Sequence, residues 1–204
     1  MLVVVAIAAI LTSVALPQLI SARRLMRSNA LPREIATQLR FARQQAMSQR
    51  QAFTLQYDDS TKQIRIFDHN NNNNATSGCN MTGTQVLTAT NYPNTACSTA
   101  VLTVPMAGGA GLPTSEVSFG VPGVITNTTL GDNTTPTALT GTVLNITFQP
   151  EGTVLDWQGN FASPTLFLYN NKVPSQTAAA ISVLGSSGRI KIWRYDTSAN
   201  KYAE

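Results

Sequence analysis

The stretch Met1–Ala22, MLVVVAIAAILTSVALPQLISA, contains no charged residue, and Arg23 and Arg24 follow it directly. A helix needs about 20 apolar residues to cross the hydrocarbon core of a bilayer, and Met1–Ile20 meets this requirement with Leu, Val, Ile and Ala. We interpret this stretch as a helix that inserts into a membrane or packs among other subunits. Since the remainder of the chain is polar and rich in loops, we expect it to be anchored or assembled through its N-terminus.

Two other interpretations of this stretch stay open. Ser13-Val14-Ala15 looks like the small-residue cleavage site of a secretory signal peptide, which would leave a secreted β-domain protein that begins at Leu16. The stretch has no charged residue upstream of that site, however. A buried core helix is the weakest alternative, because a helix that is apolar on every face needs a large surrounding protein.

The chain continues as a helix with one apolar face. A narrow apolar stripe recurs at spacings of four, three and four residues, as in a helix packed on a domain; its members are Ile35, Leu39, Ala42 and Ala46. Arginines flank the stripe on the polar surface, at Arg33, Arg40, Arg43 and Arg50. A helix over residues 1–51 would be about 75 Å long, far more than a bilayer is thick, so its second half must lie on a head domain. We expect Pro17 and Pro32 to kink or locally open it.

The rest of the chain has the pattern of short strands. Strands are predicted at Ala52–Tyr57, Gln63–Phe67, Gln85–Thr90, Val101–Pro105, Val117–Phe119, Val143–Gln149, Thr153–Trp157, Thr165–Tyr169, Ala180–Leu184 and Arg189–Tyr195. The turn at Asp58–Thr61 joins the first two as a hairpin, and His69–Gly83 is a low-complexity loop. The sequence therefore predicts an α+β fold, with a long helix over residues 1–51 packed on an antiparallel β-sheet head domain over residues 52–204.

Composition and cysteine content indicate an exported head. Only 12% of the residues are charged, against about 25% in a typical protein. Cys79 and Cys97 have no second pair of metal ligands, and the only histidine is His69, so a zinc site lacks ligands. We favour a disulfide, which would stabilise the fold by about 3 kcal/mol and require an oxidising compartment; two free thiols are the alternative. Arginines after a membrane span usually stay cytoplasmic, but we give the cysteines more weight and place the head outside.

The residue inventory argues against an enzyme. One histidine, in the sequence DHNNN, is a poor basis for a catalytic triad, and we expect it in a solvated turn. Glu151 and Asp156 could be paired carboxylates, but they lie in a turn-rich stretch. The glycines at 108, 109 and 111 lack the Lys-Ser/Thr of a phosphate-binding loop. We predict no catalytic activity, no cofactor, no metal and no small-molecule substrate.

The last predicted strand is a candidate DNA-binding surface. Strand alternation places Arg189, Lys191, Trp193 and Tyr195 on one face. On such a face the cations could contact phosphates and the aromatic rings could stack on bases. The candidate residues are Arg189, Lys191, Trp193 and Arg194. The favoured alternative is a strand with a polar outer face whose Trp and Tyr cover the edge of the sheet.

With these residues in view, the chain resembles type IV pilin-like proteins. MLVVVAIAAILTSVALPQL is similar to the pilin N-terminal helix, including Pro17 where pilins carry a helix-kinking proline. The remainder resembles the H-type minor pseudopilins of type II secretion and the related FimT and FimU minor pilins. Three stretches carry this likeness: LPREIATQLRFARQQAMSQRQAFTLQY (31–57), FQPEGTVLDWQGNF (148–161) and SSGRIKIWR (186–194). Residues 70–140 match nothing that we can name.

The resemblance implies a structural subunit. Its N-terminal helix would sit in the inner membrane as a single span, with a periplasmic head, and then pack among neighbouring helices of a pilus or secretion pseudopilus, near the tip. The residues expected to make these contacts are Val4, Ile7, Leu11 and Pro17, with small residues Ala6, Ala8, Ala9 and Ser13 allowing close approach. The partners would be other pilins or pseudopilins, the inner membrane, and in one alternative DNA.

Two departures from the family pattern are visible. In FimT-type proteins a closing Gly-Arg-x-Arg segment is tied to DNA uptake, whereas Gly188–Lys191 ends in Lys, which lacks the guanidinium fork. Pilins also carry a basic leader, cut by a prepilin peptidase, and a glutamate next to the position where this chain begins. We therefore expect that the chain is truncated at Met1 or that its start is assigned late.

Overall fold

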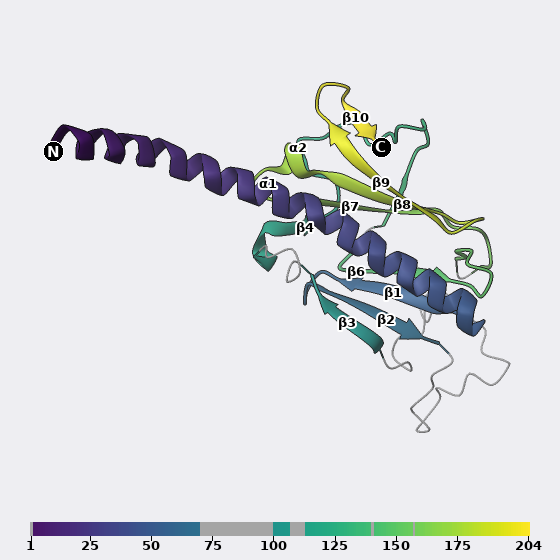
Figure 1. Ribbon diagram of the computed structural model, residues 1–204. Coiled ribbons are helices and arrows are strands. Elements are labelled where there is room, and N and C mark those ends of the chain that lie inside the picture. Colours follow the sequence, from purple (N-terminus) through teal and green to yellow (C-terminus); the bar gives the residue numbers. More distant parts are fainter. Residues whose placement is uncertain (1, 70–99, 107–112, 140, 157) are drawn as a thin grey trace.

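The computed structural model describes residues 2–69, 100–106, 113–139, 141–156 and 158–204, with side chains from residue 18 onward. One long helix lies along two β-sheets whose strands are mainly antiparallel, as Figure 1 shows. The predicted α+β class, with an N-terminal helix on an antiparallel β head, is confirmed.

Helix α1 (Leu2–Gln49) is a single element. Pro17 and Pro32 lie inside it, and the helix continues through both, so the expected local opening is wrong. A proline removes only one backbone donor, and Pro32 is buried where packing holds the helix in place. Figure 1 shows the ribbon curving gently over its length.

The predicted membrane segment falls largely outside the described side chains. Val4, Ile7, Leu11 and Pro17 all precede residue 18, so their contacts are not described. Within the described part of the chain, no helix combines the length and the apolar character needed to span a membrane.

Two sheets form the head. The first has the order β3 (Ala100–Pro105), β2 (Gln63–Asp68), β1 (Phe53–Asp58), β6 (Val143–Phe148). The second has the order β10 (Lys201–Ala203), β9 (Arg189–Asp196), β8 (Ala179–Leu184), β7 (Pro164–Asn170), β4 (Val117–Phe119), with β5 (Thr137–Ala138) pairing in parallel with β7. Two short helices, η1 (Thr114–Glu116) and α2 (Pro174–Thr177), flank the second sheet.

Most predicted strands are confirmed to within one residue at each end, including the first hairpin, in which Asp58 pairs with Gln63. The strand predicted at Thr153–Trp157 is wrong among its described residues. Val154 and Leu155 each form only an isolated bridge, because Asp156 ends the extended segment in a turn: its Oδ1 accepts from the backbone N–H groups of Gln158 and Asn160. The strand at Gln85–Thr90 and the disulfide between Cys79 and Cys97 lie outside the described residues.

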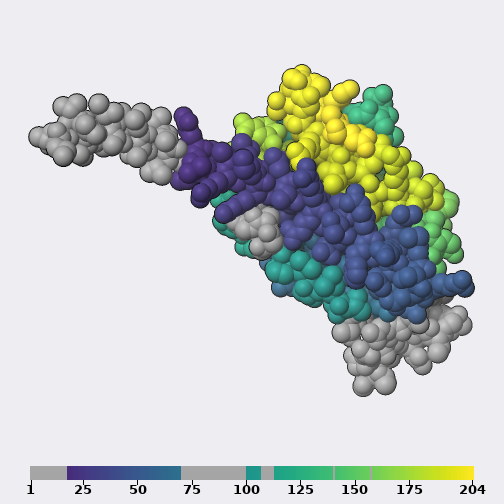
Figure 2. Space-filling model, viewed as in Figure 1, coloured from purple at the N-terminus to yellow at the C-terminus, as the bar shows by residue number. Residues whose placement is uncertain are grey.

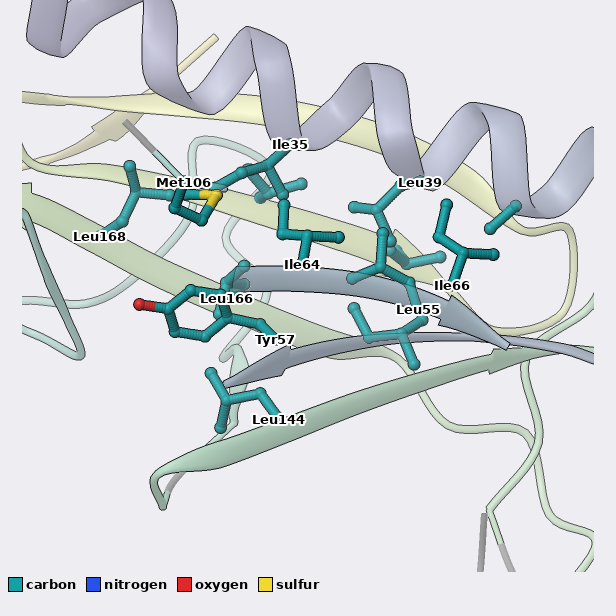
Figure 3. Packing of buried hydrophobic residues seen from close by; sticks show 14 of the residues in the cluster. Ile35, Leu39, Leu55, Tyr57, Ile64, Ile66, Met106, Leu144, Leu166 and Leu168 are labelled. Atoms are coloured by element: carbon teal, nitrogen blue, oxygen red, sulfur yellow. The ribbon is translucent and has the colours of Figure 1, made fainter. Parts of the chain in front are cut away.

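The inner face of α1 fills the junction between the two sheets. The predicted stripe is confirmed, since each of its members is fully buried: Ile35, Leu39, Ala42 and Ala46. Figure 3 shows Ile35 and Leu39 directed toward Ile64 and Ile66 of β2 and, from the second sheet, Leu166 and Leu168 of β7 in the same cluster. At the edge of this junction Tyr57 of β1 stacks on Phe119 of β4, with ring centroids 3.6 Å apart.

The second sheet is covered on both faces. Alternate residues of β7 and β8 point toward α1, and the residues between them belong to a second apolar cluster on the opposite face. The buried members of this outer cluster are Ile125, Leu130, Phe167, Ala178, Ala180, Trp193 and Tyr202. The irregular segment that carries Ile125 and Leu130 therefore acts as a third layer.

We expect Leu39→Ala to lower the free energy of unfolding by about 3 kcal/mol, because it opens a cavity where the helix meets both sheets. Leu39 is 0% exposed. Gln44→Ala on the exposed side of the same helix is the matched control and should change stability little. Denaturant unfolding of the purified chain measures both, and equal effects would contradict this account of the core.

Candidate functional site

The helix leaves the head close to Arg24. Ser28 is buried, whereas the side chains from Gln18 to Arg23 are exposed. Figure 1 shows α1 extending beyond the sheets at its N-terminal end, and Figure 2 shows its described residues lying across one face of the head. We call the part of α1 before Arg24 the stalk.

A network of polar side chains holds the helix at this exit. Arg24 donates to Glu116 of η1 in a bidentate ion pair, Nε to Oε2 at 2.9 Å and an Nη to Oε1 at 3.0 Å. Asn170, at the end of β7, donates from Nδ2 to the same Oε2 at 3.1 Å and to Ser28 Oγ at 3.0 Å. Its backbone N–H donates to Thr177 of α2. We call this network the Arg24 anchor. It joins α1, η1, β7 and α2. The two parallel hydrogen bonds of a bidentate pair stabilise the contact and also fix the orientation of the two groups.

The Glu116 carboxylate is held in its charged form. Burial alone would raise its pKa, but the hydrogen bonds from Asn170 and Arg24 and the nearby charges of Arg24 and Lys172 outweigh burial. The pKa of Glu116 therefore lies below its ordinary value. Sequence patterns gave no sign of this site, because Arg24 and Glu116 are 92 residues apart and nothing in either segment marks the pairing.

A second anchor, the Arg43 anchor, lies at the other end of the buried part of the helix. The Arg43 guanidinium donates to the carbonyl oxygens of Gly152 at 3.3 Å and Ser187 at 2.9 Å. Gly152 and Gly188 have φ values of +79° and +61°, and a Cβ on Gly188 would lie 1.9 Å from Gly152 O. Glycine is required there for both conformation and space.

The three stretches that resemble the pilin family meet at the Arg43 anchor. Arg43 belongs to residues 31–57, Gly152 to 148–161, and both Ser187 and Gly188 to 186–194. Their sequence pattern thus corresponds to one packed junction in space.

The predicted DNA-binding residues do not share one exposed surface. Trp193 is 2% exposed, lies in the outer cluster, and donates from Nε1 to Ser182 Oγ at 2.8 Å. Lys191 Nζ lies 4.6 Å from the centroid of that ring and 3.5 Å from Glu204. Arg189 is exposed on the same face of the strand, whereas Arg194 lies on the other and donates to Asn29 O at 3.5 Å. The indole offers no open face for base stacking, because the layer carrying Ile125 and Leu130 covers it.

The other residues considered for catalysis or metal binding lie in turns or make hydrogen bonds within the fold. Asp156 accepts a backbone hydrogen bond from Gln158 within a turn, and Glu151 is exposed. The expected solvated position of His69 is wrong: the residue is partly buried, burial lowers its pKa, and Nε2 lies 2.5 Å from Thr54 Oγ1. In the described residues, no group of three His, Cys, Asp or Glu side chains could hold a metal.

We expect Arg24→Gln to lower the free energy of unfolding by about 1 to 2 kcal/mol at neutral pH. Because the folded-state pKa of Glu116 is lowered, its contribution is present above the unfolded value of 4.5 and is lost as the pH falls through the folded value. The difference between wild type and variant should therefore shrink as the pH falls below 4.5. Denaturant unfolding across this range tests it, with the exposed Arg23→Gln as control; a pH-independent difference would contradict the anchor.

We expect Gly188→Ala to destabilise the chain by about 2 to 4 kcal/mol, since it adds a backbone clash to an unfavourable φ. Gly159→Ala is a matched control: Gly159 has φ +84° and no atom lies within 4 Å of the place that a Cβ would take, so only the conformational strain applies. Thermal unfolding of both variants separates the two effects. Equal losses would show that the Arg43 anchor is not tightly packed.

No protein-family model matches the chain, and no curated protein matches its sequence. Among solved structures it is similar to the type IV minor pilin FimU of Pseudomonas aeruginosa in two crystal forms. One has 16% identity and a TM-score of 0.44 and covers 83% of this chain and 88% of that one; the other has 15% and 0.42 and covers 80% and 90%. It is also similar to the minor pseudopilin EpsH of the Vibrio cholerae type 2 secretion system, with 11% identity, a TM-score of 0.41, and coverage of 79% and 91%. These values by themselves carry no argument about function.

Proposed function

We propose that this chain is a structural minor pilin or pseudopilin subunit, which assembles through its N-terminal helix into a type IV pilus or a type II secretion pseudopilus. The observation that carries the proposal is the division of α1. One uninterrupted helix, Leu2–Gln49, begins with a stretch free of charge and ends as the central element of the head core.

This arrangement suits a subunit held by its helix. The buried stripe, the Arg24 anchor and the Arg43 anchor act on the same element, and the two anchors are 19 residues apart, about 28 Å along the axis. The apolar stripe resists separation of helix and head, and the directional hydrogen bonds at its ends resist rotation and sliding. A head fixed in this way follows any movement of the stalk.

The sequence motifs support the same family. Because the three pilin-like stretches converge on Arg43, Gly152 and Gly188, a requirement for their joint packing accounts for their presence in one chain.

The finer steps of the proposal come from the sequence. Before assembly, Met1–Ile20 would occupy the inner membrane with the head on the periplasmic side, in keeping with the cysteine pair. It would then pack among neighbouring helices through Val4, Ile7, Leu11 and Pro17. A position near the tip stays a prediction.

Binding of DNA through Arg189 and Lys191 also stays a prediction. We do not adopt it as a second function, because Trp193 is buried and Lys191 lies beside Glu204.

Val4→Arg or Ile7→Asp should abolish incorporation into filaments, since each places a charge in the apolar stretch. Immunoblotting of sheared filaments from cells that carry the variant measures this, and Val4→Ile is the matched control that should assemble normally. A head fragment beginning at Gln18 keeps the Arg24 anchor and should stay folded and soluble. Normal assembly of either charged variant would count heavily against the proposal.

A further inference from the structure

The base of the head, where the stalk emerges, is rich in cationic side chains. A hollow of about 270 Å³ opens there between α1 and the segment before β4. Its lining residues are Ile20, Arg23, Arg24, Arg27, Pro113 and Glu116. The first acid in the sequence is Glu34, so the stalk and the helical turns after it contain no carboxylate of their own.

Among the described residues, the one carboxylate that lines the hollow is already engaged. Glu116 pairs with Arg24 through two hydrogen bonds and accepts a third from Asn170. Arg23 and Arg27 are exposed, and Lys172 is exposed and close enough to act on Glu116 electrostatically. We call Arg23, Arg27 and Lys172 the basic collar. Arg23 and Arg27 line the hollow, in which Glu116 pairs with Arg24, and Lys172 lies near Glu116.

The collar lies at a fixed distance from the apolar stretch. If Met1–Ile20 spans the hydrocarbon core, Arg23 and Arg27 follow its end by about 5 and 10 Å along the helix. The headgroup layer of each leaflet is about 5 to 8 Å thick, so Arg23 lies at its depth and the long side chain of Arg27 can reach back to it. The apolar side chains between and beside the arginines are also exposed, Leu19 by 48%, Ile20 by 57% and Met26 by 73%. A mixture of exposed apolar and cationic side chains suits the boundary between lipid and water.

We propose that the basic collar binds the phosphate headgroups of anionic phospholipids while the N-terminal helix is in the membrane. This inference rests on the proposed function, because it requires the helix to be inserted. Arginine is suited to the task, since its planar guanidinium donates two parallel hydrogen bonds to a phosphate. The contact sets the depth at which the head sits on the bilayer, and it must be broken when the subunit moves into a filament.

The test uses the full chain reconstituted in phosphatidylcholine vesicles with a trace of spin-labelled phosphatidylglycerol or spin-labelled phosphatidylcholine. Electron paramagnetic resonance gives the fraction of each lipid that the protein immobilises. We expect a preference for phosphatidylglycerol of about fivefold for the wild type. Arg23→Gln with Arg27→Gln removes two of the three cations of the collar and should reduce the ratio most of the way to one. Arg33→Gln with Arg40→Gln removes two exposed arginines farther along the same helix and should leave the preference unchanged.

The possible outcomes separate the two proposals. If the wild type immobilises both lipids to the same extent, the collar does not select anionic lipid. If the two double variants lose the preference equally, the collar is not its source. Either result would overturn the collar proposal and leave the proposed membrane helix untouched. No immobilisation of either lipid would overturn the membrane step of the proposed function as well. Replacing chloride with inorganic phosphate at equal ionic strength should preserve the preference, and its loss would show a site for free phosphate instead.

Discussion

Burial of the apolar stripe of α1 between two sheets is the interaction on which the head depends. Ile35 and Leu39 contribute to a cluster that also contains residues of β1, β2, β6, β7 and β8. Ala42 and Ala46 are small, so the last turns of the helix can approach the strands closely. Without this helix, each sheet would expose an apolar face to water, with a loss of about 25 cal/mol for every Å² uncovered.

Polar anchors at the two ends of the stripe add direction to this packing. Apolar contacts are non-directional, whereas the pairing of Arg24 with Glu116 and of Arg43 with two carbonyl oxygens allows one rotation and one register of the helix. The stalk therefore leaves the head along a defined axis. If the chain assembles through its helix, as proposed, this rigidity passes the position of the stalk on to the head.

Local patterns predicted most of the secondary structure, because they depend on neighbouring residues. The spacing of Ile35, Leu39, Ala42 and Ala46 identified the buried face of the helix, and apolar alternation located the hairpin of β1 and β2. The same method failed at Thr153–Trp157, where a single carboxylate, Asp156, redirects the backbone. The short elements β5, β10 and α2 contain too few residues to show a period.

The sequence by itself determined that a helix with an uncharged N-terminal stretch precedes an antiparallel β head, and which face of that helix the head buries. Its residues also carried the likeness to minor pilins and pseudopilins. Only the tertiary structure decided that Trp193 is buried beneath a third layer, that Arg24 pairs with Glu116, and that Arg43, Gly152 and Gly188 meet. The physical reason is range: periodicity is a property of adjacent residues, whereas these contacts join segments that only the folded chain brings together.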